Sequence, residues 1–167
     1  MNIPFSPPDI TEEEIEAVAE VMRSGWITTG PKTKELERKM AEFTHTNRGV
    51  CLNSATSCME MALRLFEIGP GDEVIVPAYT YTASASVVCH VGATLRLVDV
   101  EKGTFHIDYA AVESMINENT KAIIPVDLGG VMVDYDRIRA IVESKKSLFR
   151  PSSKMQEALG HILILAD

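Results

Sequence analysis

The apolar positions of the chain fall into short runs, separated by longer stretches in which apolar residues recur every three or four positions. The short runs, which predict strands, are residues 49–52, 73–76, 94–100, 122–126 and 162–166. Helices are predicted between them, near residues 55–66, 82–91, 108–116 and 134–143. Several runs are uniformly apolar, which is typical of parallel strands covered by helices on both faces. The pattern therefore predicts an α/β fold with a mainly parallel sheet and flanking helices.

Two more helices are predicted before the first of these strands. Thr11 and Glu14 have the spacing of a capping box at the start of the first helix. A loop, residues 25–30, leads to Pro31, which suits the first position of the second helix. The N-terminal part of the chain is therefore expected to be helical.

The composition indicates a soluble globular protein and argues against several classes of partner. Of the 167 residues, 46% are hydrophobic and 24% are charged, which suits one domain with a sizeable core. The net charge is −8 and no basic run occurs, so neither nucleic acid nor an anionic membrane surface is an expected partner. No run is apolar enough to span a bilayer, and no signal peptide is visible. We expect a cytoplasmic protein with no domain boundary inside residues 1–167.

The cysteine and histidine residues give no metal or disulfide pattern. Cys51, Cys58 and Cys89 are odd in number and lie in apolar surroundings, so we expect reduced, buried thiols. Their spacing matches no zinc site, and none of the four histidines has a carboxylate or cysteine at ligand spacing. We therefore predict neither a metal site nor a Ser-His-Asp or Cys-His arrangement.

The strongest local signal lies in residues 51–57, where a predicted buried strand meets the start of a predicted helix. Ser54, Ala55 and Thr56 are small or carry hydroxyls, and the N–H groups at a helix start are free to bind an anion such as phosphate. Simple capping of the helix by Asn53 or Ser54 is the alternative. The chain has no glycine fingerprint of the dinucleotide or Walker type, which argues against those ligands.

Two further features follow predicted strands, at the sheet edge where open α/β folds bind ligands. Tyr79 and Tyr81 come after the second run, where an aromatic ring can stack on a flat cofactor or pack beneath a loop. Asp167 follows the last run, where a carboxylate can meet a cationic ring nitrogen or cap a following helix. In the earlier loop, Trp26 lies between glycines, so the loop is either a substrate loop or a hinge with a buried tryptophan anchor.

Several segments, in order along the chain, resemble the DegT/StrS-type sugar aminotransferases, a branch of the fold-type-I enzymes that use pyridoxal phosphate (PLP). These segments are residues 24–31, 53–57, 69–77, 92–94, 121–126 and 166–167. The resemblance implies that residues 1–167 form the N-terminal part of the PLP-binding large domain. It further implies that the chain amounts to less than half of such an enzyme, without the small domain.

The resemblance also implies roles by position. Matching residues in the family hold the cofactor phosphate, stack on its pyridine ring, and pair with its pyridinium nitrogen so that the ring can act as an electron sink. The corresponding cofactor-binding residues of this chain are Ser54, Ala55 and Thr56 for the phosphate, Tyr81 for the ring and Asp167 for the nitrogen. The segment that resembles the family's substrate side, near its dimer interface, contains Trp26, Thr28, Thr29 and Gly30.

The catalytic lysine of the family, which bonds covalently to the cofactor and then moves the proton, lies beyond the segment that resembles Ala166–Asp167. No lysine of this chain matches that position. Without it the covalent anchor and the general base are both missing. No catalytic residue is therefore expected within the chain, and residues 1–167 alone are expected to be inactive.

For the complete enzyme, the resemblance implies a homodimer that transfers an amino group, with glutamate as expected donor, to a nucleotide-linked keto sugar. Such a step belongs to amino sugar and polysaccharide biosynthesis. Some relatives are PLP-dependent sugar dehydratases in which histidine replaces the lysine, so a dehydratase is the second hypothesis. A third is a non-enzymatic α/β module for binding or assembly.

Overall fold

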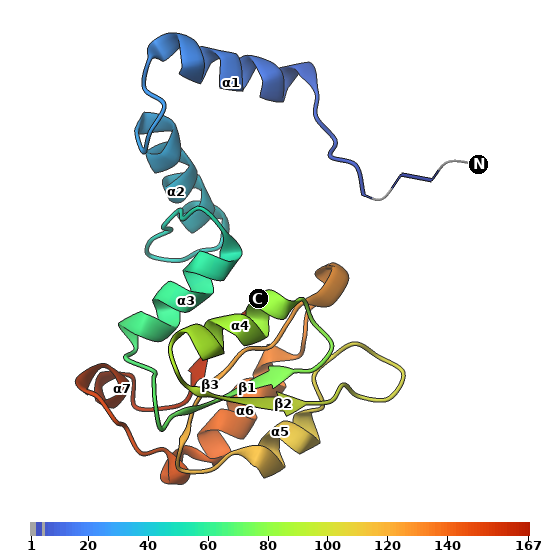
Figure 1. Cartoon of the computed structure of the whole chain (residues 1–167), viewed down its shortest axis with the longest axis vertical. Helices are drawn as coiled ribbons and strands as arrows, with labels where there is room; N and C mark the ends of the chain where they lie inside the picture. Colours follow the sequence, from blue (N-terminus) through green and yellow to red (C-terminus); the bar gives the residue numbers. More distant parts are fainter. Residues whose placement is uncertain (1–2, 5) are drawn as a thin grey trace. The chain divides into compact units, whose positions relative to one another are not determined.

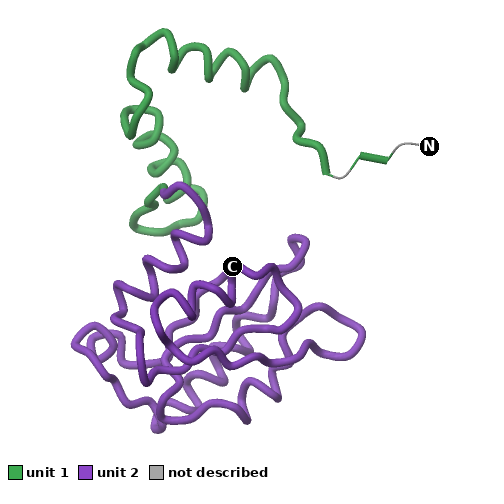
Figure 2. The backbone as a smooth tube through the Cα atoms, viewed as in Figure 1, with its two compact units in different colours: residues 1–51 green, residues 52–167 purple. Residues whose placement is uncertain are grey.

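The chain divides into two compact units, residues 1–51 and residues 52–167 (Figure 2). The structure, a computed structural model, describes residues 3–4 and 6–167. None of the helices in the described residues combines the length and apolar character needed to cross a membrane. The sequence shows no boundary at residue 51, and the assignment of the whole chain to one larger domain stays a prediction.

The first unit contains two helices, α1 (Glu12–Ser24) and α2 (Pro31–Phe43). The predicted capping box is confirmed at α1: the Thr11 hydroxyl accepts from the Glu13 N–H at 3.2 Å, and the Thr11 N–H donates to the Glu14 carboxylate at 2.7 Å. Pro31 occupies the first position of α2, where its missing N–H needs no partner. Local sequence signals thus account for both helix starts.

The strand predicted over residues 49–52 is wrong, because this segment has no regular secondary structure. The Cys51 N–H donates to the Glu37 carboxylate at 3.1 Å, and Val50 is exposed. An extended run becomes a strand only when a neighbouring strand pairs with its backbone groups. No strand in the described residues pairs with this segment.

The second unit is built on a four-stranded sheet with the order β2-β1-β3-β4 (Figure 1). All three strand pairs are parallel, which confirms the predicted α/β fold with a parallel sheet. The strands are β1 (Glu73–Pro77), β2 (Thr94–Val98), β3 (Thr120–Ile123) and β4 (Leu163–Ile164). The helices of this unit are α3 (Ala55–Leu65), α4 (Thr82–His90), α5 (Tyr109–Met115), α6 (Tyr135–Ser144) and α7 (Lys154–Leu159), with short 3-10 turns at Leu128–Gly130 (η1) and Lys146–Leu148 (η2).

The last strand is shorter than predicted, yet its backbone pairing continues beyond it. The Leu165 N–H donates to the Ile123 carbonyl at 3.0 Å, and the Asp167 N–H donates to the Pro125 carbonyl at 3.0 Å. The apolar run therefore stays extended alongside the chain that follows β3. This pairing carries the end of the chain to the carboxyl edge of the sheet.

Side chains of β1 alternate between two apolar clusters on opposite faces of the sheet. Val74 and Val76 pack with residues of α3 and α4, whereas Ile75 packs with residues of α5 and α6. All three side chains are fully buried. Both faces of the sheet are covered, which explains why this strand is uniformly apolar.

The expectation of buried thiols is wrong. Cys58 and Cys89 are exposed, Cys51 is half-buried, and all three are free. Each exposed cysteine is the neighbour of a buried residue, Met59 in α3 and Val88 in α4. Successive residues of an α-helix point about 100° apart, so an apolar neighbourhood in sequence does not place a residue on the buried face.

A group of charged side chains connects α3 with the end of α4. The Glu60 carboxylate accepts from the Arg64 guanidinium at 2.9 Å and lies 2.8 Å from Nδ1 of His90. Arg64 first, and then His90, lower the pKa of Glu60 below its ordinary value of 4.5. Because the folded-state pKa is depressed, ionised Glu60 contributes stability at neutral pH, and this contribution is lost as the pH falls through the folded-state value.

We therefore expect Glu60→Gln to lower the urea midpoint of unfolding at about pH 7 and to have a smaller effect at about pH 3.5. Glu157→Gln is the matched control, because Glu157 forms no ion pair with any described residue. Urea unfolding followed by circular dichroism measures both variants. An equal loss for Glu60→Gln at the two pH values would contradict the role given to the ionised carboxylate.

Candidate functional site

The carboxyl edge of the sheet in the second unit holds a carboxylate that is fixed through its backbone. The Asp167 N–H donates to the Pro125 carbonyl at 3.0 Å, and the Asp167 carbonyl accepts from the Asp127 N–H at 2.9 Å. Both partners lie on the segment that follows β3. Asp167 therefore lies at the sheet edge where the sequence pattern predicts a ligand site.

The side chain of Asp167 is held by α4. The buried Ser84 hydroxyl donates to Oδ2 of Asp167 at 2.5 Å, and the Thr80 hydroxyl lies 2.8 Å from the Ser84 hydroxyl. Ser84 is 0% exposed. Sequence reasoning missed both hydroxyls, although the four-residue spacing of Thr80 and Ser84 at the start of a helix was a usable signal.

The two tyrosines that follow β1 differ in their surroundings. Tyr81 is the N-cap residue of α4, and its side chain is 82% exposed, so it does not pack beneath a loop. Tyr79 stacks on Phe105 with ring centroids 5.1 Å apart and an interplanar angle of 19°. Tyr81 is thus the more exposed of the two rings and is open to a flat ligand, and Phe105 is a neighbour of the site that the sequence did not indicate.

The start of α3 combines a helix cap with unused backbone donors. The Ser54 hydroxyl accepts from the Ser57 N–H at 3.1 Å, which is the capping bond that the sequence offered as an alternative to anion binding. The N–H groups of Ala55 and Thr56 belong to the first turn, where no acceptor exists within the helix. Capping and anion binding are therefore compatible at this helix start.

A second carboxylate beyond β3 organises the loop next to Asp167. Asp127 accepts from the Val133 N–H at 2.9 Å and from the Tyr135 hydroxyl at 2.9 Å. Burial, followed by the hydrogen bond to Asp127, raises the pKa of Tyr135 far above its ordinary value of 10.0. The Tyr135 hydroxyl therefore remains a proton donor to Asp127 over the whole physiological pH range.

The buried lysine of the second unit lies at the opposite edge of the sheet. Lys121 is 4% exposed at the start of β3, and its ammonium donates to the Glu118 carbonyl at 2.5 Å. Burial lowers the pKa of Lys121 below its ordinary value of 10.5, and the charge of Asp72 opposes this effect. Lys121 is thus placed at the amino edge, away from the strand ends that hold Asp167.

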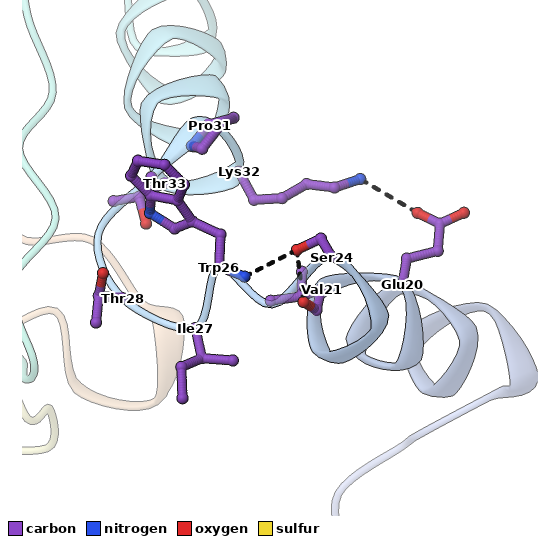
Figure 3. Close-up of a pocket in the computed structure, with 10 residues that line it drawn as sticks. Glu20, Val21, Ser24, Trp26, Ile27, Thr28, Pro31, Lys32 and Thr33 are labelled. Carbon is purple, nitrogen blue, oxygen red and sulfur yellow. Dashed lines mark hydrogen bonds and ion pairs between the residues drawn. The ribbon is translucent and has the colours of Figure 1, made fainter.

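The candidate substrate loop borders a cavity of about 510 Å³ in the first unit (Figure 3). Residues of α1 and α2 complete the cavity wall, and an ion pair of 3.4 Å joins Lys32 to Glu20 beside it. Three of the four candidate residues, Trp26, Thr28 and Gly30, line the cavity, whereas Thr29 does not.

Trp26 is 59% exposed, so the alternative of a hinge with a buried tryptophan anchor is wrong. Its indole N–H donates to the Thr29 carbonyl at 3.1 Å, which turns the ring back over its own loop. A Cβ atom at Gly30 would lie 2.3 Å from the indole nitrogen, so any side chain there would displace the Trp26 ring from this position. The loop thus presents a fixed aromatic ring at the cavity wall.

Comparison with known proteins gives one matching family and several similar structures. The model of the DegT/DnrJ/EryC1/StrS aminotransferase family matches residues 8–149. Spr1654 from Streptococcus pneumoniae, assigned as a sugar aminotransferase, is 59% identical in sequence with a TM-score of 0.96, and the match covers 100% of this chain and 42% of Spr1654. Spr1654 has been solved in an apo form, a PMP form and a PLP form.

Two more distant structures extend this comparison. The aminotransferase from Psychrobacter cryohalolentis is 34% identical with a TM-score of 0.79, over 84% of this chain and 36% of that protein. A GDP-4-keto-6-deoxymannose-3-dehydratase is 25% identical with a TM-score of 0.78, over 84% of this chain and 38% of that protein. The chain therefore spans less than half the length of each of these proteins.

Proposed function

Because the chain belongs to the DegT/DnrJ/EryC1/StrS aminotransferase family, we propose that it supplies the cofactor-binding edge of a sugar aminotransferase. The family is PLP-dependent, and the sequence-based resemblance, the cofactor of the family and the fold class are confirmed. The observation that carries the proposal is the carboxylate of Asp167, which is fixed at the carboxyl edge of the sheet by its backbone and by Ser84.

The residues present fit the cofactor. The first N–H groups of α3, at Ala55 and Thr56 behind the Ser54 cap, suit the phosphate. The exposed Tyr81 ring suits the flat face of the pyridine, and the Asp167 carboxylate suits a protonated ring nitrogen. When bound, PLP supplies an electron sink for negative charge on the substrate, and the protein supplies binding and orientation.

We propose a nucleotide-linked keto sugar as amino acceptor and glutamate as amino donor. The support is the sequence identity of 59% to a protein assigned as a sugar aminotransferase. In this proposal the loop of the first unit with Trp26, Thr28, Thr29 and Gly30 contacts the sugar, since three of these residues line a cavity. The proposal extends to a cytoplasmic homodimer that serves amino sugar and polysaccharide biosynthesis.

We test the reaction in the full-length protein that contains this chain, with ¹⁵N-glutamate and a panel of nucleotide-linked keto sugars. The expected result is ¹⁵N in the sugar product together with 2-oxoglutarate.

The similarity to a keto-deoxymannose dehydratase favours a sugar dehydratase as the second candidate. Loss of a sugar hydroxyl without ¹⁵N in the product would establish that candidate and overturn the aminotransferase.

The lysine needed for covalent attachment is not among the residues placed at the cofactor edge, and we expect the isolated 167-residue chain to be inactive. Borohydride reduction of this chain with PLP, followed by peptide mapping, measures which lysines react. Scattered labelling at less than one equivalent, unaffected by glutamate, is the expected result. One fully labelled lysine that glutamate releases before reduction would show that the chain carries its own catalytic lysine.

The third hypothesis, a non-enzymatic module for assembly, predicts a different result for the same chain. A tight dimer with very weak PLP binding would favour that module.

A further inference from the structure

The contact between Ser84 and Asp167 joins two elements that lie 83 positions apart in sequence. Ser84 belongs to α4, and Figure 1 shows the C-terminus beside this helix. The Ser84 side chain is completely buried, so no solvent competes for its hydroxyl. A buried hydroxyl needs a hydrogen-bond partner, and here that partner is one oxygen of a carboxylate.

An ordinary helix serine would instead donate to a carbonyl of the preceding turn. Such an acceptor exists, since the Tyr81 carbonyl lies 3.3 Å from the Ser84 hydroxyl. The carboxylate of Asp167 is much closer, at 2.5 Å, and hydrogen bonds to charged acceptors are shorter and stronger than bonds to neutral ones. The single proton of the Ser84 hydroxyl therefore goes to Asp167.

The hydroxyl of Thr80 completes this arrangement as the first hydrogen-bond donor in a series. Its hydroxyl lies 2.8 Å from the Ser84 hydroxyl, and either oxygen can donate in that pair. A hydroxyl has one proton and can accept two bonds, so Ser84 accepts from Thr80 when it donates to Asp167. The result is a chain of donors that runs from Thr80 through Ser84 to Oδ2 of Asp167. The other oxygen, Oδ1, receives no hydrogen bond from any described side chain.

We propose that Ser84 is a positioning residue for the cofactor: it fixes Oδ2 of Asp167 so that Oδ1 faces the ring nitrogen, and Thr80 orients Ser84. This inference rests on the proposed function, in which Asp167 pairs with the protonated ring nitrogen. Ser84 acts only through Asp167 and contacts no reacting atom. The contribution of Ser84 to the affinity for the cofactor should therefore depend on the ring nitrogen and on no other part of the cofactor.

The test measures binding of pyridoxamine phosphate, which has no aldehyde to react with surface lysines, and of its deaza analogue, in which C–H replaces the ring nitrogen. Equilibrium dialysis of the 167-residue chain gives both dissociation constants. The native chain should prefer pyridoxamine phosphate over the analogue. Ser84→Ala should reduce that preference by about 10-fold, mainly by weakening pyridoxamine phosphate, because a hydrogen bond to a charged group is lost. Ser86→Ala is the matched control, since Ser86 donates to the Ala83 carbonyl in the same helix.

The outcomes separate this inference from the function on which it rests. A native chain that binds both compounds equally, or neither, overturns the role of Asp167 and this inference with it. A native chain with a clear preference that Ser84→Ala leaves intact overturns only the role of Ser84. Should Ser84→Ala fail to fold, Thr80→Val removes the orienting hydroxyl with little change in shape. If Thr80→Val loses part of the preference for pyridoxamine phosphate, by less than the loss of about 10-fold expected for Ser84→Ala, the inference is supported. An unchanged preference in Thr80→Val contradicts it.

Discussion

Replacing Ala55 by Asp is expected to weaken the binding of pyridoxamine phosphate to this chain by about 100-fold or more. Ala55 is the first residue of α3, where the proposed phosphate site uses free N–H groups. A carboxylate placed there repels the phosphate and competes for the same donors. The helix itself should not suffer, because an acidic residue in the first turn stabilises a helix by about 0.3–1 kcal/mol.

The prediction is specific because Ala55→Asp should weaken the binding of pyridoxamine phosphate without lowering the stability of the chain. Equilibrium dialysis measures the affinity, and urea unfolding measures the stability of the same sample. Ala110→Asp is the control, because Ala110 is an exposed residue in the first turn of α5. It adds the same charge at another helix start and should leave the affinity within about 2-fold of the native value. Unchanged affinity in Ala55→Asp would exclude the start of α3 as the phosphate site.

Replacing Gln156 by Glu is expected to lower the free energy of unfolding at neutral pH by about 3–5 kcal/mol. Gln156 is buried in α7, and its amide N–H group donates to the Phe66 carbonyl and to the Asp72 carboxylate, each at 3.2 Å. Its side-chain oxygen accepts from the Ser152 N–H at 2.9 Å. Glutamate has the same shape but replaces the donor by a negative charge beside the buried Asp72.

Acid should restore part of this loss, because burial and a neighbouring carboxylate both raise the pKa of a glutamic acid. A group whose pKa is higher in the folded state stabilises the fold as the pH falls. Urea unfolding at about pH 8 and about pH 5 measures the difference. Met155→Glu adds the same charge at an exposed neighbour and should change stability by less than about 0.5 kcal/mol. An equal loss for both variants would mean that the charge of α7, and not the contact with Asp72, is responsible.

Helix starts with local signals were predictable from the sequence, whereas the strand predicted over residues 49–52 depended on a distant partner and was wrong. The box of Thr11 and Glu14 and the proline at position 31 determine their helix starts through neighbouring residues. Residues 49–52 have a similar apolar pattern to β1, but β1 pairs with strands on both sides and residues 49–52 pair with none. Strand formation depends on pairing, which a local pattern does not contain.

The candidate site was predictable only in part, for the same reason. Asp167 and Tyr81 follow predicted strands, which places them at the carboxyl edge of the sheet. Ligands bind at this edge in open α/β folds, so both residues could be selected from the sequence. The bond from Ser84 to Asp167 spans almost half the chain, and the stacking of Tyr79 on Phe105 joins two separate loops. No spacing rule predicts such contacts, because the tertiary fold creates them.

The strand order β2-β1-β3-β4 also bears on how the second unit is made during synthesis. The strand synthesised first, β1, lies inside the sheet, and β2 then pairs with one of its edges. β3 covers the other edge of β1, and β4, which comes last, pairs with β3. Each strand after β1 therefore finds a partner already in place when it leaves the ribosome. Such an order limits the time during which an open edge could pair with another nascent chain.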